Sequence, residues 1–231
     1  MQGKSGYRYS IEPFLLADFM DISPGQSVLD VGTGCGIIPI LLVHREPTLK
    51  LTAIEIQDCS QAQKNIHDNS MDAQISLVHG DFLAASLRHE SFDHIISNPP
   101  YRKMFTGRIN PDEGKALARH ELSLNLTSLM DQSTPILKKG GRITFTYPPK
   151  RLGEVLRELN NRGLYPNLAR FIHGTLEAPA KIFLVSALKG KKSDFSVAPP
   201  LTVYNKDGTY STEMRKIYAS FNYSYRGNHF R

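Results

Sequence analysis

The chain has 231 residues, 40% of them hydrophobic and 22% charged, and its formal net charge is +6. This composition is typical of one globular domain and excludes an intrinsically disordered chain, and no stretch approaches the roughly 20 apolar residues that span a bilayer. Two cysteines, Cys35 and Cys59, are too few for a disulfide framework or a zinc site. Because the first residues lack the apolar stretch of a signal peptide, we expect a cytoplasmic protein. We also expect no membrane partner and no bound metal.

The hydrophobic pattern alternates between helix-like and strand-like segments along most of the chain. Apolar residues at helical spacing predict a short N-terminal helix over residues 10–21, and the apolar run at 27–31 predicts a buried strand. Further strands are predicted over 51–56, 75–79, 92–97 and 142–147, and β-rich stretches over 164–173 and 181–188. Helices are predicted from about residue 36 and over 59–69, 112–137 and 151–161.

This order of elements predicts one α/β domain over residues 1–188. Strands that alternate with helices form crossover units, which give a mostly parallel sheet with helices on both faces. The last two β-rich stretches lack a helix between them, so we expect an antiparallel pair at one edge. Residues 189–231 are expected to form a basic appendage on the same domain, with a strand and turn over 201–210 and a short helix over 212–218. The oligomeric state stays open, with a monomer as the default expectation.

A glycine-rich turn follows the first predicted strand. Gly32, Gly34 and Gly36 let the backbone bend tightly and approach a ligand without a Cβ in the way, and the next helix offers free amides at its N-terminus. The spacing lacks the third glycine of a dinucleotide-binding fingerprint, and no Gly-Lys-Ser/Thr sequence follows as in a P-loop. We therefore expect a nucleotide-like cofactor at this turn.

Acidic residues stand at the ends of three successive predicted strands. Asp30 can reach a cationic or amine-bearing ligand, and Glu55 lies where doubly wound sheets place a carboxylate on ribose hydroxyls. Asp81 can accept a hydrogen bond from an adenine amino group, with Phe82 packed on the ring. Because the carboxyl ends of parallel strands share one edge, we expect these side chains to line one cofactor crevice, together with Ile56.

This constellation resembles the class I S-adenosylmethionine-dependent methyltransferases. The resemblance implies a Rossmann-like sheet of seven strands with the last pair antiparallel, and S-adenosyl-L-methionine as the cofactor. It also implies that Asp30 lies near the methionine part of the cofactor, that the glycines line it, that Glu55 binds the ribose and that Asp81 binds the adenine.

The quartet Asn98-Pro99-Pro100-Tyr101 follows the fourth predicted strand. The two prolines stiffen the turn and offer no amide donors, which leaves the Asn98 side-chain oxygen and the Pro99 carbonyl as acceptors. Two acceptors that hold the hydrogens of an exocyclic amine favour a pyramidal nitrogen with a free lone pair, and Tyr101 can stack on the base. We therefore predict Asn98, Pro99 and Tyr101 as catalytic residues, and Asn98 also as a cofactor contact. The quartet resembles the signature of amino-methyltransferases that act on adenine, guanine or glutamine amides.

Segments on either side of the quartet narrow this resemblance. The stretches 6–10, 102–103, 107–111 and 118–121 are similar to those of bacterial tRNA adenine-N6 methyltransferases that act beside the anticodon of a valine tRNA, at position 37. The resemblance implies tRNA as the partner, and basic and aromatic side chains suit RNA phosphates and an unpaired base. The residues expected to contact RNA are Tyr7, Arg8, Arg102, Lys103, Arg108, Arg119 and His120.

Other substrates and one other class of protein stay open as alternatives. Glutamine-amide methyltransferases normally carry an additional N-terminal domain, and DNA adenine methyltransferases usually need a target-recognition domain, for which the chain has no room. Guanine-N2 methyltransferases of rRNA tend to have Phe where Tyr101 stands. The alternative from another class is a non-catalytic RNA-binding module.

Overall fold

The computed structural model describes residues 11–99 and 125–222, and within them eight strands form one sheet in the order β3-β2-β1-β4-β5-β7-β6-β8. The strands are β1 (Ser27–Val31), β2 (Lys50–Glu55), β3 (Ile75–His79), β4 (Phe92–Ser97), β5 (Leu137–Tyr147), β6 (Leu164–His173), β7 (Ala180–Lys189) and β8 (Ser196–Thr202). The α-helices are α1 (Glu12–Phe19), α2 (Ile37–Arg45), α3 (Ser60–Asp68), α5 (Leu126–Ile136), α6 (Leu152–Asn160) and α7 (Thr212–Ser220), and a 3-10 turn covers Pro149–Arg151. The sheet confirms the predicted α/β fold class.

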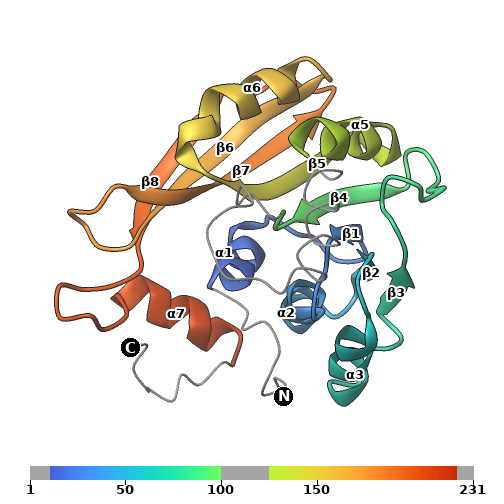
Figure 1. Ribbon diagram of the computed structural model, residues 1–231, viewed down its shortest axis with the longest axis horizontal. Helices are drawn as coiled ribbons and strands as arrows, with labels where there is room; N and C mark the ends of the chain where they lie inside the picture. The colour runs from blue at the N-terminus through green and yellow to red at the C-terminus, as the bar shows by residue number, and fades with distance from the viewer. Residues whose placement is uncertain (1–10, 100–124, 223–231) are drawn as a thin grey trace, which may run out of the picture.

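Helices cover the sheet on both faces, as Figure 1 shows: α5 and α6 lie on one side, and α1, α2, α3 and α7 on the other. Two apolar clusters fill the two interfaces. On β1, Val28 packs into the cluster that includes α1, α2 and α7, whereas Leu29 packs into the cluster that includes α5 and α6. Strands buried on both faces are continuously apolar because alternate side chains serve opposite cores, which explains the uninterrupted apolar runs in the sequence.

The parallel part of the sheet follows the prediction closely. β3 and β4 occupy the predicted residues, and β1, β2, β4 and β5 pair in parallel, as do β2 and β3. β7 is antiparallel to both β5 and β6, so the predicted antiparallel pair is present. The described residues form eight strands rather than seven, because β8 adds to β6 in parallel and takes the edge position.

The eighth strand lies earlier in the chain than predicted. The sequence predicts a strand and turn over 201–210; β8 ends at Thr202, and the residues after it form the turn, closed by a bridge between Tyr204 and Tyr210. Pro199 and Pro200 stand inside β8, where the register against β6 shifts. Proline cannot donate to a sheet ladder and is tolerated at an edge strand or a bulge, which is why the sequence pattern concealed this strand.

The boundary between α5 and β5 is a second correction. The sequence predicts a helix to residue 137 and a strand from residue 142, but α5 ends at Ile136 and β5 begins at Leu137, so Lys139-Gly140-Gly141 lies within the strand. Phe92 of β4 pairs with Leu137, yet His94 pairs with Arg142, so the glycines form an irregularity within the paired strand. The part of the predicted helix over 112–124 lies outside the described residues.

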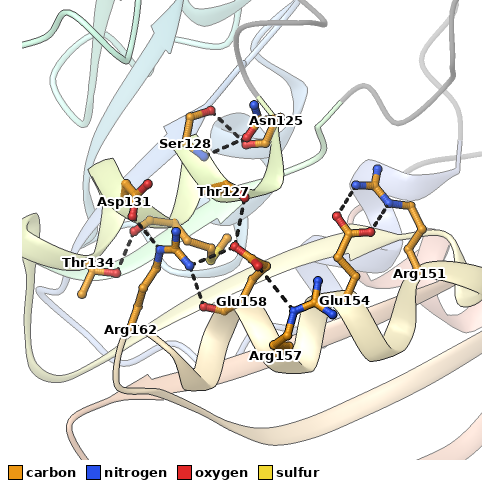
Figure 2. Close-up of polar contacts among 11 residues, drawn as sticks. Asn125, Thr127, Ser128, Asp131, Thr134, Arg151, Glu154, Arg157, Glu158 and Arg162 are labelled. Carbon is orange, nitrogen blue, oxygen red and sulfur yellow. Dashed lines mark hydrogen bonds and ion pairs between the residues drawn. The ribbon is translucent and has the colours of Figure 1, made fainter.

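An ion-pair network fastens α6 to α5 (Figure 2). The Arg162 side chain, which is 17% exposed, donates to Asp131 Oδ1 at 2.6 Å and to Glu158 Oε2 at 3.0 Å. Thr127 of α5 donates to the same Glu158 carboxylate at 2.9 Å, and the Asn125 side chain caps α5 by accepting from the Ser128 amide. Since several partners share these charges, the network stabilises this helix pair more than isolated surface pairs would.

Candidate functional site

The glycine turn between β1 and α2 has the backbone geometry that its sequence suggests. Gly32, Gly34 and Gly36 all have positive φ angles, of 75°, 57° and 78°. A Cβ at Gly32 or Gly34 would meet no atom within 4 Å, so the backbone conformation rather than crowding requires glycine there. At Gly36 a Cβ would lie 3.5 Å from the Ala62 Cβ on α3, so this glycine also faces a neighbouring helix.

Asp30, the fourth residue of β1, is fully buried directly before this turn. Neither of its carboxylate oxygens has a hydrogen-bond partner among the described residues, and the same holds for the Thr33 hydroxyl. The pKa of Asp30 is raised to about 7: burial is the largest cause, the proximity of Thr33 lowers the pKa without a regular hydrogen bond, and nearby Glu55 adds a smaller increase. An unpaired buried carboxyl group is costly in a folded protein, which is a reason to expect a ligand that compensates it.

Glu55, the last residue of β2, holds the glycine turn. Its Oε2 accepts from the Gly34 amide at 2.8 Å, and its Oε1 accepts from the Gln57 amide at 2.9 Å. The side chain is 8% exposed. Each carboxylate oxygen has a second lone pair, so both remain able to accept from a diol.

The residues predicted to bind the adenine end of the cofactor lie after β2 and β3. Asp81 Oδ1 accepts from the Leu83 amide at 2.9 Å, which makes a local turn. Phe82 is only 4% exposed and packs into the apolar cluster that includes α5 and α6, so little of its ring is open to a ligand in the described structure. Ile56 is half-buried, and its carbonyl lies 3.2 Å from the His79 ring nitrogen Nε2.

Asn98 follows β4 and bonds through both ends of its carboxamide. Its Oδ1 accepts from the Thr146 hydroxyl of β5 at 2.6 Å, and its Nδ2 donates to Glu12 Oε2 of α1 at 3.3 Å. Just before it, the Ser97 hydroxyl donates to the Val31 carbonyl at 2.9 Å and thereby ties the end of β4 to the end of β1. The glycine turn and the start of the proline quartet are therefore fixed to each other.

The pleat of the sheet places the polar groups of this site on one face. Asp30 lies two residues after Val28, and Glu55 two residues after Ala53, and both apolar residues pack into the cluster that includes α1 and α2. Because side chains alternate across a strand, both acids point to that face. Thr146 bonds through Asn98 to α1 on the same face.

The structure thus brings together Asp30, the glycine turn, Glu55 and Asn98 at the carboxyl ends of neighbouring strands β1, β2 and β4. Pro99 is buried directly beyond Asn98. The remaining predicted site residues lie outside the described residues; they are Tyr7, Arg8, Tyr101, Arg102, Lys103, Arg108, Arg119 and His120.

Sequence reasoning missed three polar residues around Asn98. Ser97 and Thr146 are fully buried within strands, and such polar residues in otherwise apolar runs are the signal that could have found them. Glu12 stands in the first turn of α1, where an acid is ordinarily explained by the helix dipole, so nothing in the sequence marks it.

Two further properties of the described residues bear on the predictions about membranes and metals. No helix over 11–99 or 125–222 has the length and apolar character needed to cross a bilayer. The same two ranges hold no group of three or more His, Cys, Asp or Glu side chains suited to a metal ion.

Sheet order, antiparallel β7 and a glycine turn after β1 define the class I methyltransferase fold, and solved structures agree. An 18% identical chain from Agrobacterium tumefaciens, described as a predicted O-methyltransferase, superposes with a TM-score of 0.74 over 91% of this chain and 96% of its own. The geranyl diphosphate C-methyltransferase of Streptomyces coelicolor, solved with S-adenosyl-L-homocysteine, gives a TM-score of 0.56 at 11% identity, over 77% of this chain and 79% of its own. At these identities the likeness concerns the fold alone.

Sequence comparison gives the family. Residues 13–147 match the methyltransferase small domain, and the chain belongs to that family. A relative from a Flavobacteriaceae bacterium, named tRNA1(Val) (adenine(37)-N6)-methyltransferase, is 28% identical over 95% of this chain and 93% of its own length. A relative of the same name from Vibrio campbellii is 30% identical over 63% of this chain and 61% of its own length.

Proposed function

We propose that this protein transfers a methyl group from S-adenosyl-L-methionine to the exocyclic N6 amine of adenine 37 in tRNA1(Val). The observation that carries the proposal is the position of the Asn98 carboxamide, fixed beside the glycine turn and on the same sheet face as Asp30. The name shared by relatives that cover nearly the whole chain supports the substrate.

The residues at the glycine turn fit this cofactor. The buried Asp30 carboxyl group has no partner among the described residues, which suits the ammonium group of an amino acid. Glu55 keeps free lone pairs for ribose hydroxyls, and the positive-φ glycines leave the backbone open to close approach. When bound, the cofactor would supply a methyl group on a sulfonium, whose carbon–sulfur bond breaks in the transfer to release the sulfur as a neutral thioether.

Asn98 and Pro99 orient the amine in this proposal. The lone pair of an adenine N6 is delocalised into the ring, so the nitrogen is a poor nucleophile until it becomes pyramidal. The Asn98 Oδ1 and the Pro99 carbonyl accept its two hydrogens and favour that geometry, and one proton leaves to water after the new carbon–nitrogen bond forms. Catalysis then consists of positioning and electrostatic stabilisation rather than of a strong general base.

The same proposal includes contacts between this chain and the RNA. Tyr101 would stack on the flipped base, and the basic residues Arg102, Lys103, Arg108 and Arg119 would follow the phosphate backbone. An anticodon-loop adenine is already unpaired, so moving it into the site costs little.

The test is methyl transfer from labelled S-adenosyl-L-methionine into bulk tRNA from a strain that lacks this gene, followed by nucleoside digestion and mass analysis. We expect new N6-methyladenosine, absent when the tRNA1(Val) used as substrate carries guanine in place of adenine 37. Label in rRNA guanine or in a protein glutamine would overturn the substrate. Cofactor binding without transfer to any RNA would favour the non-catalytic alternative.

A further inference from the structure

The Asn98 carboxamide is held from two sides by residues that lie far from it in the sequence. The Thr146 hydroxyl donates to Oδ1 at 2.6 Å from the neighbouring strand β5, and Nδ2 donates to Glu12 Oε2 at 3.3 Å on α1. The paired register explains the first contact, because Ser97 of β4 lies opposite Phe145 of β5, so the next residue along each strand meets the other.

The chemistry of Glu12 allows only one orientation of this carboxamide. An ionised carboxylate has no proton to donate, so only the Nδ2 end of Asn98 can face Glu12. A rotation of the carboxamide by 180° would put Oδ1 against the carboxylate and lose the hydrogen bond to Glu12, whereas the Thr146 hydroxyl could accept from Nδ2. The nitrogen is therefore held on the α1 side and the oxygen on the β5 side.

We infer that Glu12 and Thr146 are positioning residues that fix the Asn98 oxygen for the amine of the substrate; this rests on the function proposed above. Thr146 is fully buried, so it acts through Asn98 and not by contact with RNA. A carbonyl oxygen accepts two hydrogen bonds, and the Thr146 hydroxyl takes one, which leaves the other for an N6 hydrogen. The charge of Glu12 polarises the carboxamide and strengthens its oxygen as an acceptor.

The helix that carries Glu12 is itself rigidly placed. Pro13, Phe14, Leu15 and Leu16 of α1 are all buried. The Phe14 ring packs edge-on against Tyr218 of α7, with the ring centroids 4.9 Å apart. Because the helix is closely packed, its first turn has a fixed position. The core therefore sets the position of Glu12, and Glu12 in turn orients the Asn98 carboxamide.

The experiment compares four variants by single-turnover methyl transfer to tRNA, together with cofactor affinity by calorimetry. Thr146→Val and Glu12→Met remove the polar partner, whereas Thr146→Ser and Glu12→Gln keep a donor or an acceptor. We expect the first two to slow transfer roughly 10- to 100-fold with cofactor affinity nearly unchanged, because a misplaced acceptor costs rate rather than binding. Thr146→Ser and Glu12→Gln should transfer methyl groups at most of the rate of the parent protein.

Thr144→Val is the matched control. Thr144 is also buried on β5, two residues before Thr146 and on the same face, and it lies opposite Ile96 of β4 rather than at the level of Asn98. This control should transfer methyl groups at close to the rate of the parent protein, which separates a general effect of removing a buried hydroxyl from the loss of this particular one.

The decisive comparison uses the Asn98→Ala background. If Thr146 acts through Asn98, adding Thr146→Val to Asn98→Ala slows transfer no further. Full transfer by Thr146→Val, or a loss that persists undiminished in the Asn98→Ala background, would overturn the positioning role while leaving the proposed function intact. A parent protein that transfers no methyl group to tRNA would overturn both.

Discussion

The amide of Gly34 donates a 2.8 Å hydrogen bond to Oε2 of Glu55. This contact joins the glycine turn after β1 to the acid that ends β2, two features that the sequence presents 21 residues apart. It gives Glu55 a structural task in addition to its predicted ribose contact, because the carboxylate orients the turn on which a cofactor would lie.

Replacement of Glu55 by alanine tests this double role. The variant removes the acceptor of the Gly34 and Gln57 amides as well as the predicted ribose ligand. We expect cofactor affinity by isothermal titration to fall at least about 10-fold, since hydrogen bonds to charged groups contribute about 1.5–3 kcal/mol. Asp68→Ala, which removes an exposed acid of α3, serves as the control. An unchanged affinity in the Glu55 variant would contradict the assignment.

Replacement of Asn98 by alanine should separate binding from turnover. The change removes one of the two proposed acceptors at the reacting nitrogen while leaving the glycine turn and Glu55 in place. We expect cofactor affinity close to that of the parent and a loss of transfer on the order of 100-fold or more, as for removal of one oriented group at a reacting atom. Rapid methyl transfer by this variant would refute the proposed mechanism.

Asp30 should make both stability and cofactor binding depend on pH. Its pKa is about 7 in the folded chain and 3.8 ordinarily, so the folded state binds more protons between these values. Stability from this group therefore falls as pH rises from about 4 to about 7, by about 4 kcal/mol in all. Asp30→Asn should remove this contribution in urea unfolding and leave the protein more stable than the parent at pH 8.

Cofactor binding should respond to the same group in the opposite direction. A bound ammonium group stabilises the ionised carboxylate, so affinity for S-adenosyl-L-methionine should increase as pH rises through 7, with release of a proton. Asp30→Asn should bind more weakly and without this dependence. Equal affinities of the parent protein at pH 6 and pH 8 would show that Asp30 does not contact a cation of the cofactor.

His94 should give a pH dependence of opposite sign. Its pKa is lowered to about 4: burial is the largest cause, the charge of Arg142 also lowers the pKa, and Asp93 and Asp21 partly offset both. The unfolded chain binds the proton below pH 6.5 and the folded chain only below about 4, so stability is lost as pH falls through this window, by about 3 kcal/mol. His94→Gln should remove this loss in urea unfolding measured at pH 7 and pH 4.5. In the parent protein the contributions of Asp30 and His94 have opposite signs and offset each other. The His94 contribution should therefore be visible in Asp30→Asn, and the Asp30 contribution in His94→Gln.

The packing of α7 predicts that the C-terminal region contributes to the stability of the whole domain. Met214 is fully buried in the apolar cluster shared with α1 and α2. Met214→Ala should lower the free energy of unfolding by about 2–5 kcal/mol in one cooperative transition. Lys216→Ala, at an exposed position of the same helix, should change it by less than about 0.5 kcal/mol. A separate early transition in the Met214 variant would show that α7 unfolds independently.

The sequence by itself determined the features that depend on neighbouring residues. Short β-rich segments defined β1, β3, β4 and β6 with the bounds that the structure gives them, and the spacing of Gly32, Gly34 and Gly36 indicated a turn that in the structure has positive φ at all three positions. The acids at the strand ends could be placed together from the sequence, because the carboxyl ends of parallel strands lie at a common edge of the sheet.

Tertiary structure decided the features that depend on pairing over long distances. The edge position of β8, with its two prolines, follows from β6 offering an unpaired side, and the start of β5 follows from pairing with β4 across an irregular register. The partners of Asn98 lie 86 and 48 residues away, and no local pattern specifies them. Propensity and periodicity report what each segment favours alone, whereas the fixed orientation of a single carboxamide is set only when α1, β4 and β5 pack together.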